Sequence, residues 1–125
     1  MDIIVLLPAV IHVYIFVLES LLWDRPSTRR VFALSADEAR LTKLFALNQG
    51  FYNLFLAIAI VVGWFLRRSI LVMTDGALAG NVLIIYGLVS ISIAGLVLLL
   101  SARRLWRSAL LQVVPALLGL IALAK

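Results

Sequence analysis

The sequence predicts an all-α integral membrane protein, a bundle of four transmembrane helices. Of its 125 residues, 65% are hydrophobic and 14% are charged, and the mean hydropathy is +1.17. Soluble domains carry about 25% charged residues, so this composition is typical of a chain that lies in lipid. A helix needs about 20 mostly apolar residues to cross a bilayer. Four runs meet this requirement within a single domain of residues 1–125, and they cover 3–23, 44–66, 79–101 and 105–124.

The absence of cysteine and the position of the charges exclude several classes of function. Without cysteine there is no disulfide scaffold, no thiolate metal site and no cysteine nucleophile. The net charge of +5 resides in the connections between the apolar runs. Basic residues at such positions orient membrane proteins rather than bind phosphates. We therefore expect no nucleic-acid partner.

The lysines and arginines also predict the orientation, because cytoplasmic loops carry the excess of these residues. The first and third connections hold Arg25, Arg29, Arg30, Arg40, Lys43, Arg103, Arg104 and Arg107. The opposite side holds only Arg67, Arg68 and Lys125. We expect a multi-pass protein of the inner cell membrane with both termini outside.

The first span, Ile3 to Trp23, is predicted to be a retained helix. It lacks the basic start and the small-residue cleavage site of a signal peptide, and it contains Glu19. Pro26 ends it. The following stretch WDRPSTRRVFALS is predicted to lie along the cytoplasmic interface, as a solvated basic loop or a lipid-headgroup contact.

A capping box then predicts where the next helix begins. Ser35 and Glu38 have the spacing in which a hydroxyl and a carboxylate satisfy free amides at a helix start. From Ala36 to Leu66 the chain is predicted to continue as one helix, amphipathic at the membrane surface and then spanning.

The third and fourth spans carry packing and kink signals. Pro115 leaves the carbonyl of Leu111 without its helical partner and is predicted to kink the last span. Small residues favour close helix packing in the third span, and these are Gly87, Ser90 and Gly95.

Polar residues of three spans fall at one level near the cytoplasmic ends, by the helical rise of about 1.5 Å per residue. These residues are Glu19, Asn48, Gln49, Tyr52, Asn53 and Gln112. Facing lipid would leave such groups unsatisfied at a cost of several kcal/mol. We therefore predict that they line a shared interior pocket. His12 precedes Glu19 by nearly two turns, so we place it on the same face at the pocket's inner end.

Glu19 and His12 are the candidate acid/base residues. Glu19 is the only carboxylate inside a span, which suits proton coupling, cation binding or general acid chemistry. The alternative is a structural hydrogen bond to Asn48 or Gln49. His12 is either an acid/base partner or a neutral imidazole bound to a nearby acceptor.

No cofactor and no metal site are predicted. A single histidine does not supply the ligand set of a metal site. Haem or a metal at His12 stays a remote alternative, in which a homo-oligomer brings several copies of this residue together at an axis.

The amides Asn48, Gln49 and Asn53 are predicted to orient a ligand, together with Tyr52 and Gln112. Hydrogen bonds between membrane helices contribute only about 0.6 kcal/mol each. Three carboxamides in one turn and a half exceed what helix pairing alone needs.

Three segments together resemble a known family: HVYIFVLE, LFALNQGFYNLFLA and LLQVVPALLGL. The chain is similar over nearly its whole length to small bacterial membrane proteins of domain of unknown function family 1304. The Asn48–Asn53 stretch is its most specific part. The resemblance implies a four-helix membrane protein and no particular activity. It also implies that recurring family positions are matched by His12, Glu19, Asn48, Gln49, Asn53, Gln112 and Pro115.

Three functions remain open at this stage. The first is binding of a small apolar molecule or membrane lipid in a polar intramembrane pocket that opens to the cytoplasmic leaflet. The second is a cofactor-free membrane enzyme with acid/base chemistry, such as isomerisation or epoxide opening. The third is a proton-coupled exporter, which requires a dimer because four helices enclose only a narrow pore.

Overall fold

The computed structural model describes residues 3–68 and 74–124, and within these ranges the chain is helical apart from short turns, with no strand. The all-α prediction is therefore confirmed for this part of the chain. The elements are α1 (Leu6–Phe16), the π-helix η1 (Val17–Leu21), α2 (Pro26–Val31), α3 (Ala36–Arg68), α4 (Thr74–Ser101), the 3-10 helix η2 (Arg103–Leu105) and α5 (Trp106–Leu123).

Three helical stretches are long and apolar enough to cross a membrane: Ala36–Arg68, Gly76–Ser101 and Arg103–Leu123. In each, at most 33% of the most apolar 18-residue window is buried inside the molecule. Most of this apolar surface therefore has no protein partner, as lipid-facing helices require. The first apolar helix, Leu6–Leu21, is shorter than the predicted span 3–23.

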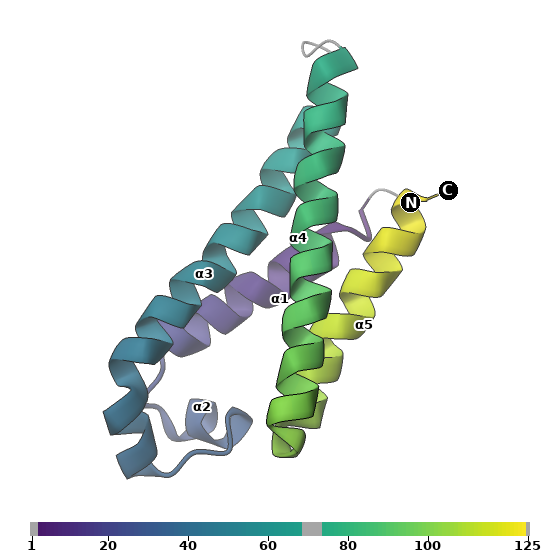
Figure 1. Cartoon of the computed structure of the whole chain (residues 1–125). Helices are drawn as coiled ribbons and strands as arrows, with labels where there is room; N and C mark the ends of the chain where they lie inside the picture. Colours follow the sequence, from purple (N-terminus) through teal and green to yellow (C-terminus); the bar gives the residue numbers. More distant parts are fainter. Residues whose placement is uncertain (1–2, 69–73, 125) are drawn as a thin grey trace.

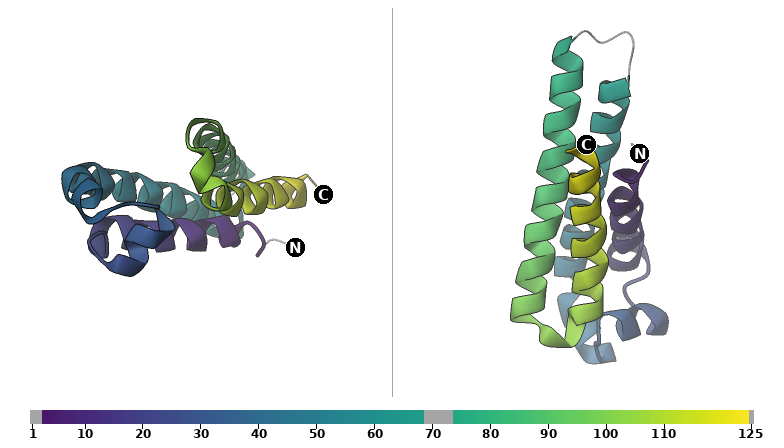
Figure 2. Two further views of the ribbon diagram at one scale, coloured as in Figure 1. Left: turned by 90° about the horizontal axis from the view of Figure 1, so that it is seen from below. Right: turned by 90° about the vertical axis from the view of Figure 1, so that its right-hand side faces the viewer.

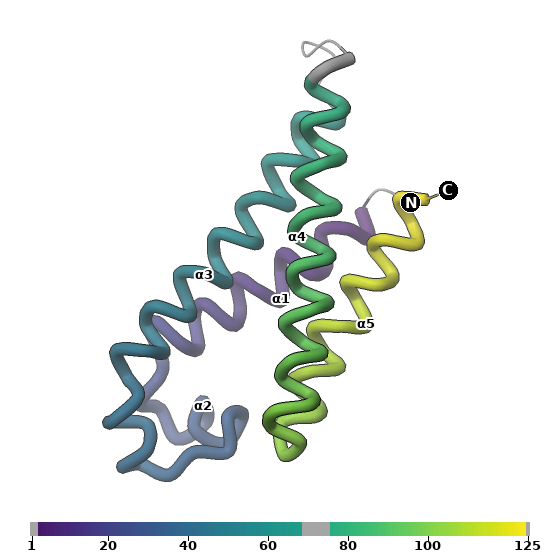
Figure 3. The backbone as a smooth tube through the Cα atoms, viewed as in Figure 1, coloured from purple at the N-terminus to yellow at the C-terminus, as the bar shows by residue number. Residues whose placement is uncertain are grey.

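The helices form two pairs that diverge towards one end. Figure 1 shows α1 beside α3, and α5 beside α4. α3 packs against α4, and α1 also contacts α5, which closes the bundle. The lower ends of α1 and α3 separate from those of α4 and α5, as the tube trace in Figure 3 also shows. The start of α1 and the end of α5 lie close together at the other end of these two helices (Figure 2).

The diverging end carries most of the positive charge, and we call it the basic end. It consists of α2, the start of α3 and the turn between α4 and α5 (Figures 1 and 2). Its cationic residues are Arg25, Arg29, Arg30, Arg40, Lys43, Arg103, Arg104 and Arg107. Arg67 and Arg68 end α3 at the opposite side, whereas Lys125 lies outside the described residues.

Away from the basic end, α3 and α4 are closely packed. The largest fully buried core side chains come from α3 and α4, and Val5, Ala9 and Ala116 complete the cluster. A Cβ atom added to Gly63 would lie 2.7 Å from the carbonyl oxygen of Gly80, and one added to Gly80 would lie 2.6 Å from that of Gly63. The backbones of α3 and α4 thus touch, and only glycine fits on either side of this contact.

The predicted capping box is present at the start of α3. The backbone N–H of Ser35 donates to the Glu38 carboxylate at 2.8 Å, and the N–H of Glu38 donates to Ser35 Oγ at 3.2 Å. α3 then continues without interruption to Arg68. The prediction of one uninterrupted helix from Ala36 through the apolar segment is confirmed.

The segment predicted as a solvated basic loop or a lipid-headgroup contact contains the short helix α2. Pro26 starts α2, where a missing N–H costs nothing. Ala33 ends it in the left-handed conformation (φ 54°), and the N–H of Leu34 donates to the carbonyl of Arg29 at 2.9 Å. This C-terminal motif turns the chain back towards α3.

Trp23 holds this segment in place. Its side chain is only 8% exposed, its indole N–H donates to the carbonyl of Ala39 at 2.8 Å, and its ring lies 5.1 Å from that of Phe32. Trp23 thus joins α2 to the first turns of α3.

Replacing Gly63 with alanine should destabilise the protein by about 1–3 kcal/mol, because the new methyl group meets backbone atoms that cannot move independently. Gly119→Ala is the matched control. Its added Cβ would meet the methyl groups of Leu88 at 3.0 and 3.3 Å, which can shift, and the Cα of Val5 at an ordinary contact distance of 3.7 Å. Reversible unfolding in lipid bicelles measures both variants. Equal loss of stability in the two would contradict the backbone contact.

The cap of α3 should make stability depend on pH. The hydrogen bond from the Ser35 backbone, reinforced by the Ser35 side chain, lowers the pKa of Glu38 below its ordinary value of 4.5. A carboxylate with a lower pKa in the folded state stabilises that state above its unfolded pKa, and this stabilisation is lost as the pH falls through the folded pKa. The melting temperature of Glu38→Ala should therefore lie below that of the parent near neutral pH and approach it below about pH 4.

Asp37→Ala is the control for this pH series. Asp37 is an exposed carboxylate of the same turn that pairs only with Arg40, at 3.4 Å. Its removal should change the melting temperature less than removal of Glu38. If the difference in melting temperature between Glu38→Ala and the parent stays constant with pH, the ionised Glu38 carboxylate does not stabilise the cap.

Candidate functional site

A cavity of about 500 Å³ lies between the diverging helix pairs near the basic end, and we call it the central cavity. All four long helical segments contribute to its walls. Val31 and Phe32, at the C-terminal end of α2, contribute at the basic end. The segment predicted to lie along the membrane surface therefore closes part of the cavity.

Glu19 reaches this cavity from the π-helix η1. The N–H of Leu22 donates to the carbonyl of Val17 at 3.0 Å, five residues back. Such π-turns add a residue to the helix and often occur at functional sites. The Glu19 side chain is 9% exposed, so its carboxyl group is almost entirely inside the protein.

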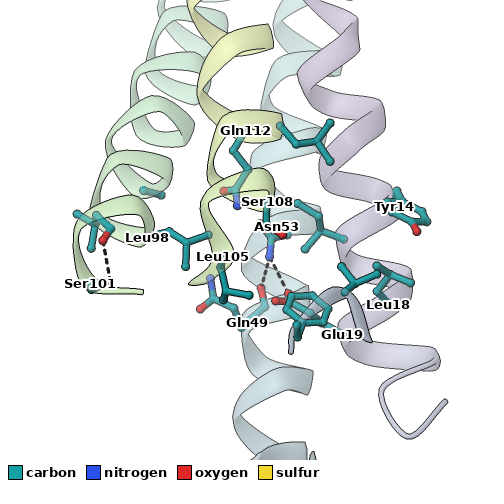
Figure 4. Close-up of a pocket in the computed structure, with 16 residues that line it drawn as sticks. Tyr14, Leu18, Glu19, Gln49, Asn53, Leu98, Ser101, Leu105, Ser108 and Gln112 are labelled. Carbon is teal, nitrogen blue, oxygen red and sulfur yellow. Dashed lines mark hydrogen bonds between the residues drawn. The ribbon is translucent and has the colours of Figure 1, made fainter. Parts of the chain in front are cut away.

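The Glu19 carboxylate is held by Asn53 of α3. Asn53 Nδ2 donates to Glu19 Oε2 at 2.8 Å and to the backbone carbonyl of Gln49 at 3.1 Å (Figure 4). Asn53 is itself 7% exposed. Both groups of this buried pair are thus hydrogen-bonded, as buried polar groups require.

Gly50 allows the close approach that this hydrogen bond needs. A Cβ atom at Gly50 would lie 2.1 Å from Ser20 Oγ and 3.2 Å from the Cβ of Glu19. The Ser20 hydroxyl also donates to the carbonyl of Leu47 at 3.4 Å. Gly50 therefore allows the close contact between η1 and α3.

Four of the predicted site residues line the central cavity: Glu19, Gln49, Asn53 and Gln112. They come from η1, α3 and α5, and Figure 4 shows their side chains around the cavity. The prediction that these helices place polar groups at a common level is consistent with this arrangement.

Asn48 and Tyr52 do not join this group, which corrects the prediction that they share the pocket. Both side chains are exposed, and neither lines the central cavity. Asn48 and Tyr52 form one ridge of α3, and Gln49 and Asn53 form the neighbouring ridge. The two ridges differ by one residue in sequence, which corresponds to a rotation of about 100° around the helix axis. Of these four residues α3 buries only Asn53, whereas Gln49 is exposed but borders the cavity.

His12 is also outside the central cavity, contrary to its predicted place at the inner end. Its side chain is 1% exposed, and Nδ1–H donates to the backbone carbonyl of Pro8 at 2.9 Å. His12 is buried on α1 with Pro8 and Ala9, whereas Glu19 belongs to the π-turn Val17–Leu21 and lines the cavity. The geometry matches the alternative of a neutral imidazole bound to the backbone.

The sequence interpretation missed several cavity residues. Ser108 precedes Gln112 by four residues on α5, and this helical spacing is a signal that would have found it. Ser101 at the end of α4 and Tyr14 on α1 also line the cavity. The contribution of Val31 and Phe32 has no such signal, because it depends on how α2 folds back.

Glu19 also lines a second cavity of about 510 Å³, on the side of η1 that faces the start of α3. Its polar residues include Asp24, Arg40 and Lys43. Lys43 forms an ion pair with Asp24. Glu19 therefore borders two cavities, the central cavity and a more polar cavity at the basic end.

The chemistry available in the central cavity is that of one carboxyl group, three carboxamides and hydroxyl groups. No lysine or arginine is among its lining residues. Within residues 3–68 and 74–124, no group of three or more His, Asp or Glu side chains is placed to hold a metal ion. The site is thus suited to hydrogen bonding, to binding of a cation by Glu19 and to proton transfer by Glu19.

Comparison with known proteins places the chain in a family. The model of the family described as Protein of unknown function (DUF1304) matches residues 6–124. The chain belongs to this family. Membership in DUF1304 confirms the resemblance carried by the three segments of the sequence and assigns no activity. No curated protein and no solved structure matches the chain.

Removing the amide of Asn53 should destabilise the protein by about 1–3 kcal/mol, because the buried Glu19 carboxyl loses its donor. Asn48→Ala is the matched control, since it deletes the same amide on the exposed ridge of the same helix and should change stability by less than about 0.5 kcal/mol. Unfolding in bicelles measures both. An equal loss of stability in the two variants would show that the Asn53–Glu19 hydrogen bond stabilises the protein no more than an exposed amide does.

Proposed function

We propose that the chain is an integral membrane protein in which four helices span the bilayer. Three helices are long enough, and their apolar faces are largely uncovered. The helix Leu6–Leu21 rises about 24 Å, somewhat less than the hydrocarbon core of about 30 Å. The apolar turn at residues 3–5 extends it, and Val5 of this turn packs in the core. Local thinning of the bilayer accommodates such a short span.

The charge distribution supports an orientation with the basic end in the cytoplasm and both termini outside the inner membrane. All eight cationic residues of the two predicted cytoplasmic connections belong to the basic end. Trp106 at the start of α5 is 49% exposed, and the guanidinium of Arg107 lies 5.3 Å from its ring centre. Such a pair is typical of a membrane interface.

We propose further that the central cavity binds a small apolar molecule or a lipid from the cytoplasmic leaflet. The central cavity carries this proposal, because its volume of about 500 Å³ and its mostly apolar walls with a few convergent polar groups are typical of small-molecule sites. It lies near the basic end, and partly exposed residues such as Tyr14 and Leu111 belong to its lining. A ligand can therefore enter from the surrounding lipid.

The purified protein should carry a bound amphiphile that mass spectrometry identifies after release from lipid nanodiscs. Leu98→Trp should abolish this occupancy, since Leu98 lines the cavity and a larger side chain fills it. Leu96→Trp is the control, because Leu96 is an exposed residue of the same helix outside the cavity lining. A preparation that repeatedly contains no ligand, or equal occupancy in both variants, would overturn the proposal.

Proton-coupled export is the second candidate, and the position of Glu19 favours it. The carboxyl group borders both the central cavity and the polar cavity at the basic end, as a group that exchanges protons with the cytoplasm must. Export by four helices requires a second copy of the chain. A pH-gradient-dependent change in drug tolerance that Glu19→Gln abolishes would favour export over simple binding. An acid/base enzyme would depend on Glu19 alone, because His12 lies outside the cavity.

A further inference from the structure

We infer that the central cavity takes an amphiphile with a primary ammonium head and a single aliphatic chain, and that Glu19 binds the head. This inference rests on the proposed function and names the ligand class of the same site. Three features of the cavity carry it: its charge, its hydrogen-bonding groups and its apolar part.

The lining of the cavity contains an acidic residue and no basic residue. Glu19 is its only carboxylate, and none of its lining residues is a lysine or arginine. The cations of the neighbouring polar cavity are already paired, Lys43 with Asp24 and Arg40 with Asp37. Among the described residues, Glu19 thus has no ionic partner, and an opposite charge within a few ångströms would stabilise its ionised form. A ligand cation supplies it.

The hydrogen-bonding groups fit an ammonium head. Glu19 Oε2 accepts from Asn53, whereas Glu19 Oε1 accepts no hydrogen bond within the part of the chain that the structure describes. The side-chain carbonyl oxygens of Gln49 and Gln112 and the hydroxyl of Ser108 add further acceptors around the cavity. A primary ammonium carries three N–H donors and no acceptor, so it matches this set.

The apolar part fits one aliphatic chain. From Leu105 at the end of η2 to Gln112 of α5 the lining extends over about 10 Å of helical rise. Ile15, Leu98 and Leu111 cover the cavity beside the polar groups. A carboxylate or phosphate head would meet the like charge of Glu19 without any lysine or arginine in the lining, so fatty acids and anionic phospholipids are disfavoured.

Binding of tritiated dodecylamine to the protein in phosphatidylcholine nanodiscs tests this ligand class, with empty nanodiscs as the background. An alkyl ammonium is protonated near neutral pH, as lysine is. We expect saturable binding that Glu19→Gln weakens at least about 10-fold, as removal of one partner of a buried ion pair does. Asn48→Ala, on the exposed ridge of α3, should bind like the parent.

Dodecanol and dodecanoic acid have the same chain length and identify what the site recognises. In the parent, dodecanol should compete only weakly with dodecylamine, because an alcohol makes no ion pair with Glu19. In Glu19→Gln, where the amine makes no ion pair either, dodecanol should compete as well as dodecylamine itself. Preference for dodecanoic acid, or amine binding that does not depend on Glu19, would overturn the ammonium site and leave the apolar pocket intact. If none of the three binds and the purified protein also carries no ligand, the proposed function itself is wrong.

Discussion

The hydrogen bond from Asn53 to Glu19 connects the polar site to the packing of the bundle. It joins η1 to α3 where Gly50 lets the two elements approach, and both side chains are more than 90% buried. Neither group is tolerable in an apolar interior without a partner, because an unsatisfied buried donor or acceptor costs about 1–3 kcal/mol. The same bond occupies one oxygen of the carboxyl group and leaves the other for the cavity. The Asn53–Glu19 hydrogen bond thus determines both the position of the first helix and the polarity of the cavity.

The molecule divides into a closely packed part and an open part along the helices. In the packed part, the glycines Gly63 and Gly80 bring α3 and α4 into backbone contact, and large side chains of the core are fully buried beside this contact. Towards the basic end the helix pairs separate (Figure 1), and the space between them becomes the central cavity. α2 borders this space because Trp23 and Phe32 pack together against the start of α3. A rigid core at one side and a hollow at the other is a common arrangement for a ligand site in a helical bundle.

Sequence reasoning recovered the features that depend on local patterns. The capping box of Ser35 and Glu38 and the long helix behind it are local, since each rests on contacts between residues a few positions apart. The inward placement of Glu19 and Asn53 followed from the cost of polar groups in hydrocarbon. The same rule misplaced Asn48 and Tyr52, because it does not say which of two adjacent ridges of a helix faces the interior. It also misplaced His12, since a buried polar group can be satisfied by its own helix, here by the carbonyl of Pro8, without facing a cavity.

The sequence by itself determined that the chain is helical, that its apolar runs are long enough to span a bilayer, where α3 begins and which connections carry the positive charge. These are properties of composition and short-range spacing, and they do not require a partner element. Only the tertiary structure decided which polar residues meet, how far the helix pairs diverge and that α2 borders the cavity. Those features depend on the rotation of each helix about its own axis and on the angles at which helices cross. Both are set by the fit of side chains between elements distant in sequence, such as Gly50 against Ser20 and Gly63 against Gly80.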